Sequence, residues 1–250
     1  MSTVIVNNLA TSYEIIGTGK TVLWLHGWGD SRATFKGLIT FLDYKSVLLD
    51  LPGFGGTEIP DAAWGLDEYA NFVSIFCQKI NIEPDIIVGH SNGGAVAIKS
   101  ISMGILKPSV LVLLASAGIR NNHKTKKYLY RIMAKVAKTA LTLIPKQKSI
   151  RFKKKMYDKI GSDINVAPNM EETFKKIINQ DILNDSIKIK IPTLIVYGGN
   201  DKYTPKEYGE LLEKNISNSR LIVLSDCGHF LHQDNPKEIS IFMKEFINAN

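Results

Sequence analysis

The segment around Ser91 constrains the fold of this chain more than any other. Asp85–Val88 is a short run of apolar and β-branched residues, which is typical of a buried strand. Gly89–Gly94 then reads Gly-His-Ser-Asn-Gly-Gly, and Ala95–Ser100 has the composition of the start of a helix. A serine between small residues on a strand-to-helix turn has the form of a nucleophile elbow, where glycines let the two backbones approach. The sequence therefore predicts an outward-facing Ser91 hydroxyl at the carboxyl end of a sheet.

A serine hydroxyl is a poor nucleophile at neutral pH, so Ser91 requires a base and a group that orients the base. His229 follows the predicted strand Arg220–Leu224, in a loop that allows its ring to reach Ser91. Asp201 follows the predicted strand Thr193–Tyr197, at the end of a parallel sheet where α/β proteins place their sites. A carboxylate there can fix the histidine tautomer. We predict that Ser91, Asp201 and His229 form a catalytic triad.

An oxyanion hole is predicted from the glycine-rich loop His26–Ser31, which follows the predicted strand Thr21–Leu25. Its glycines allow the backbone to fold back toward the elbow. The expected donors are the backbone N–H groups of Trp28 and of Asn92, the residue after the nucleophile. Taken alone, the loop is equally consistent with an ordinary strand-to-helix connection.

Alternative roles exist for several of these residues. Asp201 could be a solvated or helix-capping aspartate, but the other usual place for the acid, at 115–117, offers no carboxylate. His232 competes with His229 as the base. Gly228 suggests a close backbone approach beside His229, so we assign His232 a packing or capping role. With no His-Glu-x-x-His motif and no paired cysteine spacing, neither a metal nor a cofactor is predicted.

Short apolar runs alternate with amphipathic stretches of helical length, such as Leu66–Ile80 and Lys206–Asn215. This alternation predicts an α/β fold with a mostly parallel central sheet flanked by helices. Two early runs are expected to form an antiparallel hairpin that leads into the sheet. The predicted strands are Thr3–Val6, Ser12–Ile16, Thr21–Leu25, Ser46–Asp50, Asp85–Val88, Ser109–Leu114, Thr193–Tyr197 and Arg220–Leu224.

The alternation fails between residues 118 and 185, where apolar spacing predicts helices over Tyr128–Ile144 and Met170–Ile182. We predict a core domain of residues 1–117 and 186–250 and a helical cap of residues 118–185. The formal net charge of +7 is concentrated here: Ile119–Lys190 holds 18 of the 31 Lys/Arg and 6 of the 24 Asp/Glu. A solvated basic face is the simplest interpretation. Attraction to an anionic substrate or membrane surface is the alternative.

Composition narrows the functional classes. The apolar runs are too short for a transmembrane helix, and the first residues lack the basic and apolar regions of a signal peptide. Two cysteines, Cys77 and Cys227, do not indicate a disulfide framework, so a cytoplasmic location is expected. Without a recognisable nucleic-acid motif, a small-molecule substrate is expected and nucleic acid is not. The oligomeric state is not predicted.

The order Ser91, Asp201, His229 resembles that of the α/β-hydrolase fold superfamily, in its serine-nucleophile branch with a helical cap. Further likenesses are the loop Asp50–Gly56, the return to the core at Ile189–Ile195, and Gly228-His229 followed by Asn235-Pro236. Two positions depart from the family pattern. Gln233-Asp234 stands where a glutamate is frequent, and Asn92 stands where many relatives carry Met, Leu or Gln.

The resemblance implies a hydrolase that forms an acyl-enzyme and cleaves a carboxylic ester of a small or medium acyl substrate. A carbon–carbon bond hydrolase and a cofactor-free perhydrolase use the same triad and remain alternatives. A slow-turnover small-molecule receptor or signalling protein is the alternative outside catalysis.

Overall fold

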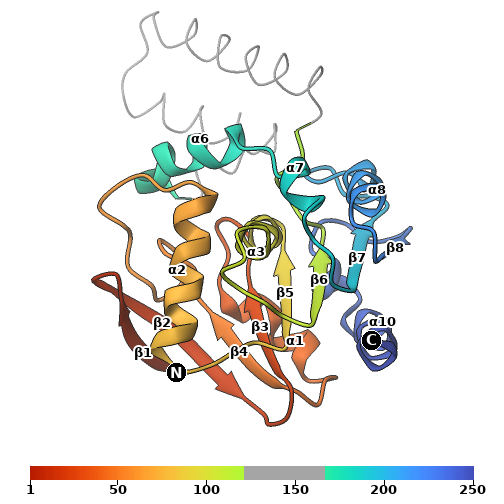
Figure 1. Cartoon of the computed structure of the whole chain (residues 1–250), viewed down its shortest axis with the longest axis horizontal. Helices are drawn as coiled ribbons and strands as arrows, with labels where there is room; N and C mark the ends of the chain where they lie inside the picture. Colours follow the sequence, from red (N-terminus) through yellow and green to blue (C-terminus); the bar gives the residue numbers. More distant parts are fainter. Residues whose placement is uncertain (121–166) are drawn as a thin grey trace, which may run out of the picture.

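A computed structural model describes residues 1–120 and 167–250 of the chain (Figure 1). Its centre is an eight-stranded sheet in the order β1-β2-β4-β3-β5-β6-β7-β8. β1 and β2 form an antiparallel hairpin, β2 pairs antiparallel with β4, and all later neighbours are parallel. The strands are β1 (Ser2–Val6), β2 (Leu9–Ile16), β3 (Thr21–Leu25), β4 (Lys45–Leu49), β5 (Ile86–His90), β6 (Val110–Leu114), β7 (Thr193–Gly198) and β8 (Ser219–Leu224).

Helices cover both faces of the sheet and bury two apolar layers. One layer lies beneath α2, α3 and α8, and the other lies beneath α1 and α10. The central strands β5 and β6 are buried along their whole length, which explains their continuous apolar sequence. The helical segments are η1 (Arg32–Phe35), α1 (Lys36–Ile39), α2 (Leu66–Lys79), α3 (Asn92–Ser102), η3 (Pro168–Met170), α6 (Glu171–Asn179), α7 (Leu183–Ser186), α8 (Lys206–Asn215), α9 (Leu231–Asp234) and α10 (Pro236–Ala249).

The α2 helix shows how local sequence fixes an element. Glu68 accepts a hydrogen bond from the Gly65 N–H at 2.7 Å, which closes the first turn. Tyr69, Phe72 and Phe76 recur at helical spacing and are fully buried against the sheet. The helix therefore combines a start signal with an apolar face, and both were readable in the sequence.

The structure confirms the predicted sheet and its lead-in hairpin, with strand ends that differ from the prediction by at most three residues. Between β6 and β7 the described residues form η3, α6 and α7. The predicted helix over Met170–Ile182 corresponds to α6, which ends at Asn179. The predicted helix Tyr128–Ile144 and most of the basic segment Ile119–Lys190 lie outside the described residues. The division into core and cap stays a prediction.

The helix α6 lies across the end of the sheet at which the parallel strands terminate (Figure 1). Lys99 of α3 contacts Asp185 of α7 at 3.3 Å and Asp67 of α2 at 3.0 Å, which ties this region to the core. Among residues 1–120 and 167–250, no helix combines the length and the hydrophobicity that a membrane span requires.

Candidate active site

Ser91 occupies a strained turn between β5 and α3. Its backbone has φ +50° and ψ −117°, a conformation that costs a non-glycine residue on the order of 1–3 kcal/mol. Neighbouring groups hold the turn in place: the Ser91 N–H donates to the Leu114 carbonyl at 3.0 Å, and the Ser91 carbonyl accepts from the Ala117 N–H at 2.9 Å. A side chain at Gly89 would lie 2.5 Å from the Gly94 Cα, and one at Gly93 would collide with the carbonyl of Leu25. Ser91 therefore has the elbow geometry that its sequence predicts.

Asp201 and His229 meet at the carboxyl ends of β7 and β8. His229 Nδ1 lies 2.7 Å from Asp201 Oδ2, and the carboxylate is fully buried while the imidazole keeps 11% of its side-chain surface exposed. Burial alone would raise the pKa of Asp201. The hydrogen bond and charge of His229, with hydrogen bonds from Thr204, outweigh burial and lower this pKa below its ordinary value. Asp201 is thus an ionised acceptor that fixes one ring nitrogen of His229.

Thr204 is a member of this site that the sequence prediction missed. Its hydroxyl lies 2.7 Å from Asp201 Oδ2 and 3.1 Å from His229 Nδ1, and its N–H donates to Asp201 Oδ1 at 3.0 Å. The same hydroxyl lies 3.0 Å from the carbonyl of Ala115, a residue with φ +45°. The available signal was its place three residues after Asp201, where a threonine commonly closes a turn onto an aspartate.

The His229 loop lies directly beside the elbow. His90, which precedes Ser91, donates from Nε2 to the His229 carbonyl at 3.0 Å, and the two imidazole centroids are 4.8 Å apart. Within the described part of the chain, the Ser91 hydroxyl makes no hydrogen bond with His229. The structure therefore brings Asp201 and His229 into contact. It places the His229 loop beside Ser91, and the contact still to be made for proton transfer is the one between Ser91 and His229.

The predicted oxyanion loop packs against the elbow from the other side. A Cβ at Gly27 would lie 3.2 Å from the Ser91 Cβ, so only glycine leaves this approach unobstructed. Trp28 follows, and its ring packs on Phe54 and Phe174 with centroid distances of 4.8 and 5.2 Å. Asn92 is the first residue of α3, so its N–H has no acceptor within the helix. The Asn92 side chain is buried, with 3% of its surface exposed among the described residues.

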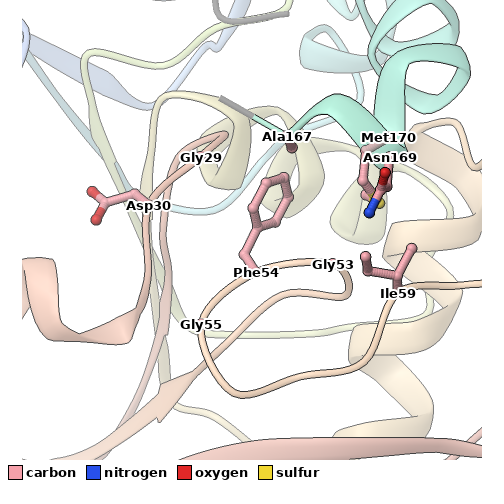
Figure 2. Close-up of a pocket in the computed structure, with 9 residues that line it drawn as sticks. All are labelled: Gly29, Asp30, Gly53, Phe54, Gly55, Ile59, Ala167, Asn169 and Met170. Atoms are coloured by element: carbon pink, nitrogen blue, oxygen red, sulfur yellow. The ribbon is translucent and has the colours of Figure 1, made fainter. Parts of the chain in front are cut away.

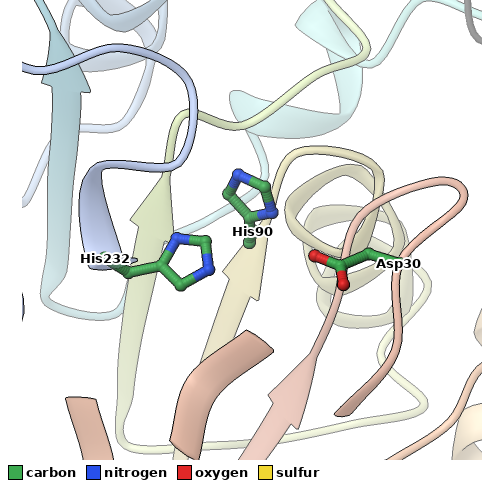
Figure 3. A group of neighbouring side chains, drawn as sticks. All are labelled: Asp30, His90 and His232. Atoms are coloured by element: carbon green, nitrogen blue, oxygen red, sulfur yellow. The ribbon is translucent and has the colours of Figure 1, made fainter. Parts of the chain in front are cut away.

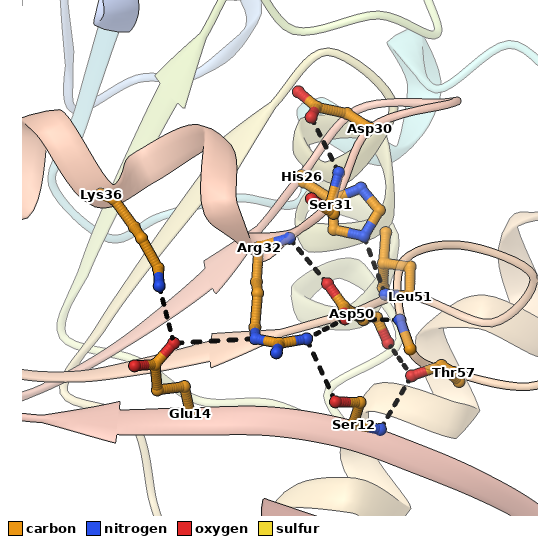
Figure 4. Close-up of polar contacts among 11 residues, drawn as sticks. Ser12, Glu14, His26, Asp30, Ser31, Arg32, Lys36, Asp50, Leu51 and Thr57 are labelled. Carbon is orange, nitrogen blue, oxygen red and sulfur yellow. Dashed lines mark hydrogen bonds and ion pairs between the residues drawn. The ribbon is translucent and has the colours of Figure 1, made fainter. Parts of the chain in front are cut away.

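A buried polar frame holds this loop in position (Figure 4). Asp50, fully buried after β4, accepts from the backbone N–H of Arg32 at 2.7 Å and of Gly56 at 2.8 Å, and it forms an ion pair with the Arg32 guanidinium. His26 Nε2 accepts from the Leu51 N–H at 2.9 Å. Burial lowers the pKa of His26, so its ring is a neutral hydrogen-bonding part of the frame. The sequence prediction did not include these long-range contacts.

A cavity of about 280 Å³ opens beside the oxyanion loop (Figure 2). Gly29 and Asp30 border it on one side, the segment from Gly53 to Ile59 on another, and η3 on a third. Phe54 and Met170 give it apolar surface. Ser91 and His229 are not among its lining residues, so it lies next to the elbow and does not contain it.

The sequence argument that used Gly228 to choose His229 over His232 gave a wrong reason. Gly228 was expected to mark a close backbone approach, but the nearest atom to a Cβ at Gly228 would be 3.9 Å away. The close approach is at Gly198, whose Cβ would collide with the Gly228 carbonyl. His232 has the packing role assigned to it: it is fully buried, its ring stacks on Phe35 at 5.3 Å, and its Nε2 contacts the Thr34 hydroxyl at 2.8 Å.

The sheet is mostly parallel and carries a strained serine elbow, and a histidine–aspartate pair lies at the ends of its last two strands. These features together define a class of α/β enzyme scaffold. Residues 22–240 match the family model described as "Alpha/beta hydrolase family". The chain belongs to this family, and its fold is the α/β-hydrolase fold.

Individual relatives agree with this assignment. The chain is 22% identical to "AB hydrolase superfamily protein YisY" of Bacillus subtilis, across 94% of each chain. It is 26% identical to "Monoacylglycerol lipase ABHD6" of Bos taurus, across 92% of this chain and 76% of that protein. Among solved structures, an esterase from Exiguobacterium antarcticum superimposes with a TM-score of 0.78 at 19% identity, covering 99% of both chains. A curated relative is thus named as a lipase, and a structure named as an esterase shares the fold.

Proposed function

We propose that this protein is a serine hydrolase that cleaves carboxylic esters of small or medium acyl groups. The observation that carries the proposal is the Asp201–His229 hydrogen bond of 2.7 Å, made beside a serine elbow with φ +50°. An ionised, buried carboxylate on Nδ1 leaves Nε2 of His229 as the proton acceptor. This is the tautomer that a general base for Ser91 requires.

In the proposed reaction, His229 removes the Ser91 proton while the serine oxygen attacks the ester carbonyl. Asp201 stabilises the imidazolium that forms. The carbonyl oxygen becomes an oxyanion, which accepts hydrogen bonds from the backbone N–H groups of Trp28 and Asn92. His229 then protonates the leaving alcohol, and water activated by the same ring hydrolyses the acyl-enzyme.

The test is hydrolysis of p-nitrophenyl esters of graded acyl length by the wild type and by Ser91→Ala. We expect turnover with an optimum at short or medium chains, and a loss on the order of 10⁴–10⁶-fold in the variant. Wild-type rates in Ser91→Ala, with matched melting temperatures, would exclude this mechanism. Ser217→Ala, an exposed serine between α8 and β8, is the matched control and should retain full activity.

Three further assays separate the alternative functions. A fluorophosphonate probe that labels Ser91 stoichiometrically, without turnover of any ester, indicates a receptor or signalling role. Hydrolysis of a vinylogous diketone faster than of every ester indicates a carbon–carbon bond hydrolase. Halide oxidation that depends on peroxide and an added carboxylic acid indicates a perhydrolase. Either activity would preserve the triad while contradicting the ester substrate.

A further inference from the structure

Asp30, His90 and His232 form a compact cluster behind the elbow (Figure 3). They come from three distant segments: the oxyanion loop, the end of β5 and the short helix α9. One ligand-type atom from each lies within 4.8 Å of the other two, and the two imidazole centroids are 4.4 Å apart. His90 is 1% exposed and His232 is fully buried. None of the three residues belongs to the proposed triad.

Each member of the cluster has one side-chain atom satisfied and one without a partner. His90 Nε2 bonds the His229 carbonyl, His232 Nε2 bonds the Thr34 hydroxyl, and Asp30 Oδ1 accepts from the Ser31 N–H at 2.8 Å. Among the described residues, His90 Nδ1, His232 Nδ1 and Asp30 Oδ2 are buried with no hydrogen-bond partner. Buried polar atoms are rarely left unpaired, so one on each of three neighbouring side chains indicates a missing partner.

The hydrogen bonds already made by the two histidine rings limit what the missing partner can be. A carbonyl only accepts, so His90 carries its proton on Nε2 and presents a bare lone pair at Nδ1. Burial lowers the pKa of His90 well below its ordinary value, and repulsion from His232 and His229 adds to this effect. Burial lowers the pKa of His232 to about 3, and repulsion from His229 adds to it. The neutral imidazole, with one nitrogen unprotonated, is the form of histidine that binds a metal ion.

We propose that Asp30, His90 and His232 bind one divalent transition-metal cation of the Zn²⁺ class through a carboxylate oxygen of Asp30, Nδ1 of His90 and one ring nitrogen of His232. Two neutral imidazoles and a carboxylate suit zinc, cobalt, nickel or ferrous iron, and not the all-oxygen preference of Mg²⁺ or Ca²⁺. Thr34 and the Ser31 N–H supply outer hydrogen bonds of the kind that orient metal ligands. Ligand atoms about 2.1 Å from a tetrahedral metal lie about 3.4 Å from one another, so binding requires side-chain movements that shorten separations of up to 4.8 Å by about 1.4 Å.

Such a site would connect the two halves of the proposed catalytic machinery. His90 immediately precedes Ser91 and holds the His229 carbonyl, while His232 lies three residues after His229. Asp30 belongs to the loop that carries Trp28. A bound cation would therefore join the elbow, the oxyanion loop and the histidine loop, so its expected effect is to stiffen all three without touching substrate.

The experiment uses the chelator-stripped full-length protein, titrated with Zn²⁺ by calorimetry and with Co²⁺ by visible absorption. We expect saturation at one equivalent, d–d bands for bound Co²⁺, and a melting temperature that rises with Zn²⁺ but not with millimolar Mg²⁺. Asp30→Asn and His90→Gln keep the hydrogen bond of the satisfied atom and remove the charged or unprotonated ligand atom, and His232→Gln removes the imidazole. Each should weaken Zn²⁺ binding by more than the roughly 10–100-fold that loss of an outer-shell partner costs.

His229→Gln is the matched control, because the proposed triad is the competing place for a metal. If His229→Gln abolishes binding while His232→Gln does not, the metal sits at the triad and the proposal is wrong. Absence of saturable Zn²⁺ and Co²⁺ binding to the wild type would overturn the proposal. If His232→Gln does not fold, the half-buried Asp30 variant still decides the matter. Binding is read without an activity assay, so its failure is distinct from failure of the proposed ester chemistry.

Discussion

Asp50 and Asp201 are two buried carboxylates at the carboxyl ends of strands, and they differ in the partners that surround them. Asp50 faces the Arg32 guanidinium and two backbone N–H groups, none of which can lose its proton near neutral pH. Asp201 faces His229 and the Thr204 hydroxyl. The guanidinium of Arg32 gives Asp50 a structural role, because its charge does not change. The imidazole of His229 can gain and lose a proton, so Asp201 can take part in proton transfer. The partner, more than burial, separates a structural aspartate from a reactive one.

Asp201→Asn should produce the largest change and should affect rate more than stability. An amide would hold His229 in the wrong tautomer, so ester turnover should fall about 10⁴-fold, as this change does in other Ser-His-Asp enzymes. Steady-state kinetics with a p-nitrophenyl ester measure the loss, and urea unfolding checks that the fold persists. A variant that keeps more than a tenth of wild-type kcat would show that Asp201 does not orient the base.

Asp50→Asn should show the opposite pattern. Removing the charge leaves the Arg32 guanidinium, whose side chain is 13% exposed, without its main counter-ion. Breaking a buried pair in this way destabilises a protein by roughly 3–5 kcal/mol. The free energy of unfolding in urea should fall by that amount, with a smaller loss in turnover that follows displacement of the oxyanion loop. Unchanged stability would mean that Glu14, 3.8 Å from Arg32 Nε, is sufficient as a counter-ion.

Thr204→Val tests whether the triad region needs its third hydrogen bond. The substitution keeps the shape of the side chain and removes the hydroxyl that contacts Asp201 and His229. A hydrogen bond to a charged group contributes about 1.5–3 kcal/mol, which corresponds to a loss of about 10–100-fold in kcat/KM. Thr204→Ser should recover most of it. If Val and Ser behave alike, the hydroxyl only fills space.

The pH dependence of stability should reveal the buried histidines of the metal-free protein. His232 has its pKa lowered to about 3, so between pH 6.5 and 3 its unfolded form binds a proton that its folded form does not. Stability is therefore fully present above pH 6.5 and decreases on acidification by about 1.4 kcal/mol per pH unit for such a histidine. His232→Gln should flatten this slope in urea unfolding series from pH 7.5 to 4. An equal slope in wild type and variant would contradict the buried, neutral state.

Much of this fold was predictable because its signals are local. The runs at Thr21–Leu25 and Thr193–Tyr197 contain the apolar pattern of a buried strand, and both strands begin where predicted. The elbow was readable because the glycine-flanked serine lies between a strand pattern and a helix pattern. The pairing of Asp201 with His229 followed from both standing at the ends of neighbouring parallel strands.

The remaining features depend on contacts between distant segments. Asp50 and Arg32 are separated by 18 positions, and no spacing rule marks them as partners. The cluster of Asp30, His90 and His232 escaped a search for short metal motifs, since its members lie on three elements. The reasoning from Gly228 was wrong because the glycine that permits the approach, Gly198, lies on the facing strand.

The join between β6 and β7 has a consequence for how this family varies. The two strands pair directly, Leu111 with Thr193, although about 80 positions of sequence separate them. β5, which precedes Ser91, and β7, which precedes Asp201, lie on either side of β6. The pairing of these three strands does not require contacts from the intervening chain. The segment between β6 and β7 can therefore change in length or charge to suit a new substrate, while the sheet keeps Ser91 and Asp201 aligned.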